Sequence, residues 1–166
     1  MSSNSPMPAP DKKPIEILFS YAHEDEKLRT RLEKHLSSLK NQQRIEWWYD
    51  EKILPGAKWG DSISTYLDKV DIILLLISAN FIASNYCNTV ELKRALERHE
   101  KGEVRVIPVI LSPCDWHDEP FAVLQAVPKN GTPVEEWSNL DSALLDVAKG
   151  IKRVVEDLEK ARKLSP

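Results

Sequence analysis

The stretch Val70-Asp71-Ile72-Ile73-Leu74-Leu75-Leu76-Ile77-Ser78 decides the fold that this sequence predicts. Its centre, Ile72–Ile77, is an unbroken aliphatic run with no polar position that could face water. A strand of this kind must be buried on both faces, which is typical of parallel sheets covered by helices on both sides. We therefore expect this stretch to be a central strand of such a sheet.

Further strand and helix patterns alternate on both sides of this run. The expected strands are Ile15–Tyr21, Arg44–Asp50, Val70–Ser78, Val104–Leu111 and a short fifth one at Phe121–Val127. The expected helices are Glu24–Leu39, a short one from Asp61, a turn of helix within Ala79–Tyr86, Asn88–Lys101 and Leu140–Leu158. This alternation predicts an α/β fold: a doubly wound, flavodoxin-like, five-stranded parallel sheet with helices on both faces.

The 166 residues suit one domain, since domains cluster around roughly 100–150 residues. Residues 1–13 belong to a proline-rich, weakly hydrophobic start and are expected to be a disordered leader. Residues 14–158 form the expected domain. The charged residues 159–166 are interpreted as a helix end or a linker.

Composition excludes several classes of protein. The net charge of −3 argues against a nucleic-acid binder, which would normally carry a basic face. No apolar run reaches the roughly 20 residues of a membrane span, and no signal peptide is visible. Two cysteines, Cys87 and Cys114, form no disulfide framework. We expect a cytoplasmic protein with reduced thiols and no membrane association.

Most enzyme motifs are absent as well. The sequence has neither a G-x-G-x-x-G nor a G-x-x-x-x-G-K-[ST] phosphate loop, no G-x-S-x-G elbow and no metal-ligand spacing of His and Cys. A receiver domain would need an acceptor aspartate after the third strand, where Ser78-Ala79-Asn80 stands instead. Cys87 is a candidate nucleophile, but a free cysteine is more commonly a small buried thiol. No metal or resident cofactor is expected.

Function is expected at the carboxyl ends of the strands, where open parallel sheets bind their ligands. The segments there are Ser20–Asp25, Asp50–Trp59, Ser78–Glu91 and Ser112–Glu119. Several motifs lie in or beside the strands and these segments. In chain order they are Ile17-Leu18-Phe19-Ser20-Tyr21-Ala22-His23-Glu24-Asp25, Trp48-Tyr49-Asp50, Leu54-Pro55-Gly56 before Lys58-Trp59, Ser78, Ser84-Asn85-Tyr86-Cys87 before Glu91-Leu92, and Val106-Ile107-Pro108-Val109. In this order, the motifs make the chain resemble a Toll/interleukin-1 receptor (TIR) domain of the bacterial type, from about Pro14 to Leu158.

The resemblance implies one of two functions. Some members of the family are non-catalytic adaptors that bind other TIR domains, and host-signalling mimics belong with them. Others cleave NAD⁺ at the nicotinamide–ribose bond, giving nicotinamide and ADP-ribose or a cyclic ADP-ribose isomer. In bacteria such enzymes often serve antiphage defence. We expect this second activity, with NAD⁺ as substrate rather than cofactor.

Glu91 is the residue on which this choice depends. In enzymatic members, the glutamate that precedes Leu at the start of this helix is catalytic. Nicotinamide leaves NAD⁺ as a neutral molecule, so no general acid is needed, and one carboxylate could stabilise an oxocarbenium-like ribose. Spacing alone favours another role, because Asn88-Thr89-Val90-Glu91 fits a helix capping box.

The resemblance also implies a set of residues that contact the substrate. They are Ser20, Tyr21, His23, Asp50, Trp59, Tyr86 and Cys87. An aromatic at Trp59 would stack on the substrate base, a contact worth roughly 1–3 kcal/mol, or would pack over the following helix. Tyr21 is alternatively the last packed residue of its strand, and His23 a solvated loop residue.

The other contact residues also have ordinary alternatives. Ser20 would bond a phosphate or begin the next helix, and Asp50 would order the following loop or form a turn. Many active members have tryptophan four residues before the glutamate. Cys87 stands there in this chain, so Tyr86 is expected to take over the packing role or to be a surface residue.

The apolar loop Ile53-Leu54-Pro55-Gly56 corresponds to the interaction loop of the family. Exposed apolar residues often mark partner contacts. In enzymatic members head-to-tail assembly completes the active site, and contacts of this type build open filaments. The expected partners are therefore NAD⁺ and other copies of the chain, without nucleic acid.

Overall fold

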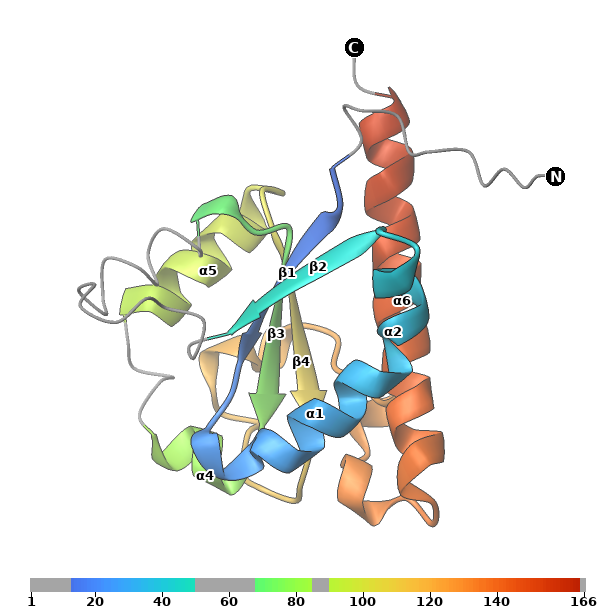
Figure 1. Cartoon of the computed structure of the whole chain (residues 1–166). Helices are drawn as coiled ribbons and strands as arrows, with labels where there is room; N and C mark the ends of the chain where they lie inside the picture. Colours follow the sequence, from blue (N-terminus) through green and yellow to red (C-terminus); the bar gives the residue numbers. More distant parts are fainter. Residues whose placement is uncertain (1–12, 50–67, 85–89, 165–166) are drawn as a thin grey trace, which may run out of the picture.

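The computed structural model describes residues 13–49, 68–84 and 90–164 (Figure 1). Its centre is a sheet of four strands in the order β2-β1-β3-β4. The strands are β1 (Ile15–Ser20), β2 (Ile45–Tyr49), β3 (Ile72–Ile77) and β4 (Arg105–Ile110). All three strand pairs are parallel, which confirms the predicted α/β fold with a covered parallel sheet.

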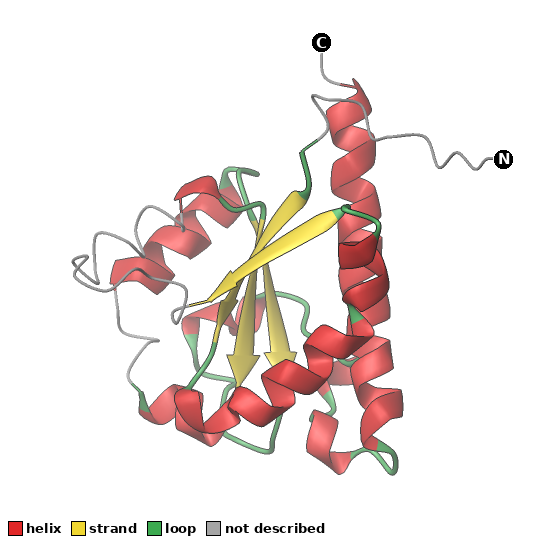
Figure 2. Cartoon of the chain, viewed as in Figure 1, coloured by secondary structure: helices red, strands yellow, loops and turns green. Residues whose placement is uncertain are grey.

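The strands are surrounded by helices, drawn in red in Figure 2. The α-helices are α1 (Glu26–His35), α2 (Ser37–Asn41), α4 (Ala79–Ala83), α5 (Val90–Glu100) and α6 (Leu140–Leu164). Short 3-10 helices lie at η1 (His23–Asp25), η4 (Pro120–Val123), η5 (Lys129–Gly131) and η6 (Val134–Glu136). The helix expected at Glu24–Leu39 is thus divided into η1, α1 and α2, and the short helix expected from Asp61 begins outside the described residues.

Two hydrophobic cores lie on the two faces of the sheet. One joins the strands to α1, α2 and α6, with Phe19, Leu32 and Leu144 fully buried. The other joins them to α4, α5 and η4, with Phe81 and Phe121 buried. Every residue of Ile72–Ile77 has a relative exposure of 0% and alternate residues enter the two cores, so this run is indeed the central covered strand.

The expected fifth strand, Phe121–Val127, is wrong for the described structure. Phe121 is buried as part of the 3-10 helix η4, which begins at Pro120. Only Val127 reaches the sheet, where its N–H donates to the carbonyl of Pro108 at 2.9 Å and its carbonyl accepts from Ile110 at 2.8 Å. The following residue is Pro128, which has no N–H to continue the ladder.

Main-chain donors in the middle of both outer strands already have partners within the chain. In β2, the N–H of Trp47 donates to the carboxylate of Glu46 at 2.9 Å, and Lys40 binds the same oxygen at 2.8 Å. In β4, the N–H of Val106 donates to Nδ1 of His99 at 3.0 Å. These side chains therefore take hydrogen bonds that a neighbouring strand would otherwise make.

Helix α6 extends beyond the expected end at Leu158, so that most of residues 159–166 are a helix end rather than a linker. Arg44, before β2, donates to both carboxylate oxygens of Glu159 at 3.1 and 2.8 Å. That hydrogen-bonded pairing raises the pKa of the Arg44 guanidinium. Arg162 similarly donates to Asp71, before β3, at 3.0 Å. Polar contacts to the amino ends of the strands thus hold the last turns of α6.

Glycine at position 150 allows α6 to approach the segment that carries Val127. A Cβ atom at Gly150 would lie 3.0 Å from Cγ1 of Val127. We expect Gly150→Val to lower the free energy of unfolding by about 1–3 kcal/mol, the usual cost of overpacking. Urea denaturation measures this, and the same substitution should cost less in a Val127→Ala background. Equal costs in the two backgrounds would contradict the proposed contact.

A second prediction concerns acid stability at the start of α6. Hydrogen bonding by His35 and by Arg31 lowers the pKa of the Asp141 carboxyl. The folded pKa lies below the unfolded value of about 3.9, so this stabilisation is present above that pH and is lost as pH falls through the lowered pKa. Asp141→Asn should therefore be less stable than the parent at pH 6, with the gap closing below about pH 4. Urea midpoints at several pH values measure this; a difference between Asp141→Asn and the parent that stays constant from pH 6 to below pH 4 would refute it.

Candidate functional site

The candidate site lies at the carboxyl ends of the strands, where the described part of the chain brings together the segments after β1, β3 and β4. Ser20 is the last residue of β1 and is 6% exposed. Ser78 directly follows β3 and is 1% exposed. Ser20 pairs in register with Leu75 of β3, so the two strands run side by side up to this edge.

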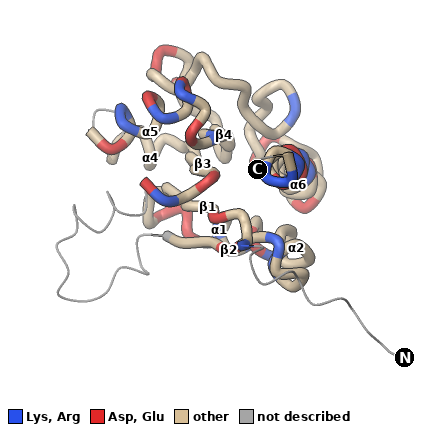
Figure 3. The backbone as a smooth tube through the Cα atoms, turned by 90° about the horizontal axis from the view of Figure 1, so that it is seen from above, with Lys and Arg blue, Asp and Glu red and all other residues tan. Residues whose placement is uncertain are grey.

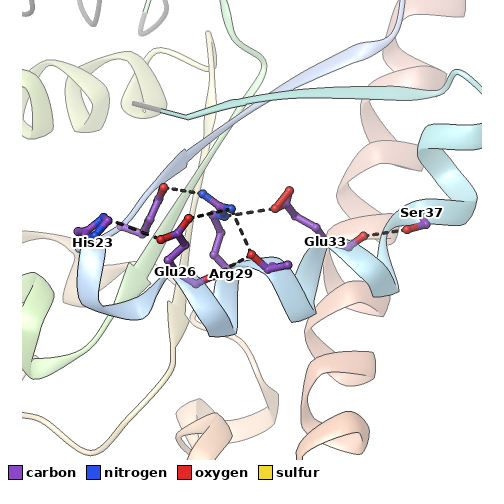
Figure 4. A network of polar contacts seen from close by, with 7 residues as sticks. His23, Glu26, Arg29, Glu33 and Ser37 are labelled. Carbon is purple, nitrogen blue, oxygen red and sulfur yellow. Dashed lines mark hydrogen bonds and ion pairs between the residues drawn. The ribbon is translucent and has the colours of Figure 1, made fainter. Parts of the chain in front are cut away.

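Tyr21 contacts a polar cluster that includes Arg29 and Glu33 of α1. Both of these α1 residues are labelled in Figure 4. Its hydroxyl accepts a hydrogen bond from Nη1 of Arg29 at 2.5 Å, and the guanidinium carbon lies 4.9 Å from the ring centre. Arg29 is itself buried, and its Nε lies 3.2 Å from a carboxylate oxygen of Glu33. This placement supports the interpretation of Tyr21 as a packed strand-end residue.

His23, two residues further on, is in a different environment. Its side chain is 83% exposed, and Nδ1 lies 4.0 Å from a carboxylate oxygen of Glu26. Figure 4 shows it at the open end of the same row of polar side chains. The imidazole is therefore accessible to a ligand at this edge, whereas the ring of Tyr21 is not.

Asp25 is a buried carboxylate that the sequence did not mark as a site residue. Its Oδ2 accepts a short hydrogen bond from the hydroxyl of Ser78, and its Oδ1 accepts one from Nδ2 of Asn80 at 3.3 Å. Asp25 and Ser78 lie far apart in the chain. Their positions were the available signal for this contact, because each residue follows a predicted strand and the two strands are neighbours in the sheet.

Cys114 lies in the segment that follows β4 and is half-buried. Burial raises the pKa of its thiol, and the negative charges of Asp115 and Asp25 raise it further. A thiol with a raised pKa is a poor nucleophile at neutral pH. The partial burial and the raised pKa of Cys114 therefore argue against a nucleophilic role.

Glu91 lies in the first turn of α5 and is half-buried. An acidic side chain here interacts favourably with the helix dipole. The next residue, Leu92, is 1% exposed, so the core fixes the helix directly beside the carboxylate. Among residues 13–49, 68–84 and 90–164, none forms a hydrogen bond or ion pair with this carboxylate.

The remaining predicted site residues lie outside the described residues. They are the substrate contacts Asp50, Trp59, Tyr86 and Cys87 and the assembly loop Ile53, Leu54, Pro55 and Gly56. Asn88, the other half of the predicted capping box, lies outside them too. The described structure thus places Ser20, Tyr21, His23 and Glu91 and leaves the roles of the others as predictions.

Figure 3 shows that acidic and basic residues are interspersed along the helices. Within the described ranges, no group of three or more His, Cys, Asp or Glu side chains could hold a metal ion. None of the described helices is both long enough and apolar enough to cross a membrane.

An open groove lies elsewhere on the molecule, at the outer edge of β4 against α6. The residues that line it include Arg105, Ile107 and Arg153.

Comparison with known proteins gives consistent matches. The TIR domain family matches residues 17–144 of the chain. An uncharacterized protein of Sinorhizobium fredii is 51% identical over 136 residues, which are 82% of this chain and 42% of that protein. The chain therefore spans less than half the length of this relative.

Comparison with solved structures gives two further matches, of which the first shows the same fold. The TIR domain of the Toll-related receptor TRR-2 from Hydra magnipapillata superposes with a TM-score of 0.50 at 15% identity, covering 84% of this chain and 97% of that domain. The TIR domains of the activated Roq1 resistosome, which recognizes the pathogen effector XopQ, give a TM-score of 0.46 at 20% identity, covering 91% of this chain and 85% of theirs.

Proposed function

We propose that this chain, which belongs to the TIR domain family, is an NAD⁺ glycohydrolase. It cleaves the bond between nicotinamide and ribose and releases nicotinamide with ADP-ribose or a cyclic ADP-ribose isomer. Glu91 is the catalytic residue of this proposal. NAD⁺ is the substrate, and no metal or resident cofactor takes part.

The observation that carries the proposal is the position of Glu91 in a chain of this family. The side chain is half-buried in the first turn of α5, and the buried neighbour Leu92 holds that turn to the core. A carboxylate held in this way can stabilise positive charge that develops on the ribose as the pyridinium ring departs. The leaving nicotinamide needs no proton, so one carboxylate suffices to stabilise the ribose as that bond breaks. Water then adds to the ribose carbon and loses a proton to solvent, which gives ADP-ribose.

Other residues would bind the dinucleotide. His23 is exposed in η1, three residues after the end of β1, and can donate a hydrogen bond to a ligand or accept one from it there. Tyr21 lies beneath this loop, where Arg29 holds its hydroxyl, so it would support the loop from inside. Ser20, Asp50, Trp59, Tyr86 and Cys87 complete the proposed substrate contacts, with Trp59 stacking on a base.

Self-association is part of the proposal. The loop Ile53-Leu54-Pro55-Gly56 of one copy would contact the next copy head to tail, and repeated contacts would build a filament. Activity should then rise faster than linearly with protein concentration. The proposed setting is the bacterial cytoplasm, and the proposed role is antiphage immunity signalling through NAD⁺ loss or a cyclic product.

A second candidate is a non-catalytic module that binds other TIR domains, either as an adaptor or as a mimic of host signalling. Two observations favour it. The hydroxyl of Tyr21 is occupied by Arg29, and an acidic residue in the first turn of α5 is explained by helix stability alone. Neither requires a substrate.

Product analysis separates the two candidates. The protein is incubated with NAD⁺ at several concentrations, and the products are separated by HPLC. Nicotinamide release supports the glycohydrolase, and the second product peak distinguishes linear from cyclic ADP-ribose. Intact NAD⁺ at the highest protein concentration, with self-association visible by light scattering, would instead favour the interaction module.

A further inference from the structure

The neighbouring strands β1 and β3 lead to opposite faces of the sheet. The segment after β1 leads to α1, which packs in one hydrophobic core, whereas the segment after β3 leads to α4, which packs in the other. The point where the chain diverges in this way is where open parallel sheets usually bind ligands. Here the side chains of Asp25 and Ser78 meet across it.

Ser78 connects three parts of the structure through one hydroxyl. It donates to the carboxylate of Asp25, and the same oxygen accepts the N–H of Phe81 at 3.0 Å, which caps the start of α4. Asn80, in the first turn of α4, donates to the other carboxylate oxygen of Asp25. The start of α4 is therefore bound to the segment after β1 by two side-chain hydrogen bonds.

This arrangement buries the carboxylate of Asp25, which costs free energy. Asp25 is 8% exposed and Ser78 is 1% exposed. A buried carboxylate loses hydration, and hydrogen bonds must replace it. The partners that the structure gives it are a hydroxyl and an amide. An apolar pair would pack here without that cost, so the network is explained best by the geometry that it imposes.

That geometry extends to α5. From Ser78 the chain reaches Glu91 through α4 and residues 84–89 only. Phe81 buries α4 in the core, and Leu92 buries the first turn of α5 in the same core. The start of α4 is thus hydrogen-bonded to the segment after β1, and α4 shares a hydrophobic core with the first turn of α5.

We propose that Asp25 and Ser78 are positioning residues that hold the carboxylate of Glu91 in place relative to the segment after β1. The inference rests on the proposed function, since it assigns them to NAD⁺ cleavage. Neither side chain contacts the substrate. They act by fixing the start of α4, which packs through Phe81 in the same hydrophobic core as Leu92 in the first turn of α5.

The test compares deletion and conservative variants. In Asp25→Ala and Ser78→Ala, we expect kcat for nicotinamide release to fall about 10–100-fold while KM changes less than about threefold, because misplacement of a reacting group weakens the transition state most. Asp25→Asn keeps an oxygen that can accept from Ser78, so it should recover most of kcat. Asp118→Ala, an exposed aspartate near the same edge, is the matched control and should leave kcat unchanged. Unchanged kcat in folded Asp25→Ala and Ser78→Ala would overturn the proposal.

Hydrogen exchange gives a readout that does not need activity. The amides of residues 94–97 bond to the carbonyls of the first turn of α5. In both alanine variants, the amides of residues 94–97 should exchange about tenfold faster relative to the amides of the buried part of α6. Asp25→Asn should restore the slower exchange rate of the parent. If Asp25→Ala does not fold, Ser78→Ala decides between the outcomes.

The two measurements keep the proposals apart. A parent protein that releases no nicotinamide overturns the glycohydrolase, and exchange alone then decides whether Asp25 and Ser78 order α5. An active parent whose alanine variants exchange normally at residues 94–97 retains the glycohydrolase and overturns the positioning role.

Discussion

Replacing Glu91 by alanine is expected to reduce nicotinamide release from NAD⁺ by about 10³-fold, the upper range for removing one electrostatic group from a transition state. The carboxylate is half-buried in the first turn of α5, where it can approach a cationic ribose. HPLC of nicotinamide under saturating NAD⁺ measures the loss. Glu97→Ala, an exposed glutamate on the same helix, is the control and should retain full activity.

Glu91→Gln separates charge from helix capping. Glutamine can serve at this position of a capping box, but it cannot neutralise an oxocarbenium-like ribose. We therefore expect Gln to be nearly as inactive as Ala, with both variants within about 1 kcal/mol of the parent in unfolding free energy. A fully active Gln variant would refute the electrostatic role, and a fully active Ala variant would remove Glu91 from catalysis altogether.

The second large effect is expected in the central strand. Leu74→Ala should lower the free energy of unfolding by about 2–5 kcal/mol, because it leaves a cavity where the surroundings relax only partly. Leu74 is 0% exposed on β3, the strand hydrogen-bonded on both sides by β1 and β4. For a domain of this size the melting temperature should fall by about 4–20 °C, measured by calorimetry.

Leu145→Ala is the matched control for this substitution. Leu145 lies on α6 and is 45% exposed, so the same atoms are removed without a buried cavity. Its effect should stay within about 0.5 kcal/mol. Similar losses at both positions would mean that the core is not packed as described.

The sequence predicted the central sheet well because aliphatic runs report burial directly. The strand expected at Val70–Ser78 contains β3, and that expected at Val104–Leu111 contains β4. The prediction of a fifth strand failed because Phe121 fills the core from a 3-10 helix rather than from a strand. Apolar character alone does not distinguish these two cases.

The end of α6 could not be predicted from hydrophobic periodicity. Beyond Leu158 the helix is held by Glu159 with Arg44 and by Arg162 with Asp71. These pairs join residues that are distant in the chain, so they become visible only when the strands are placed. Surface ion pairs of this kind are weak individually, and they leave no periodic signal in a sequence.

The sequence predicted which segments meet at the carboxyl ends of the strands, but it did not predict all of the contacts between them. The sequence indicated the segments after β1 and β3, and the structure places Ser20 and Ser78 there. It did not indicate that Asp25 and Ser78 form a hydrogen bond, because that depends on the register in which β1 pairs with β3. The burial of Tyr21 against Arg29 likewise depends on how α1 turns after η1.

The side-chain partners of the outer strands limit how copies of this domain can polymerise. Glu46 occupies the N–H of Trp47 on one margin, and His99 occupies that of Val106 on the other. A second molecule adding a strand at either margin would have to displace these groups, which disfavours the endless cross-strand ladder found in amyloid. Contacts between folded copies should therefore use surfaces other than the margins of β2 and β4.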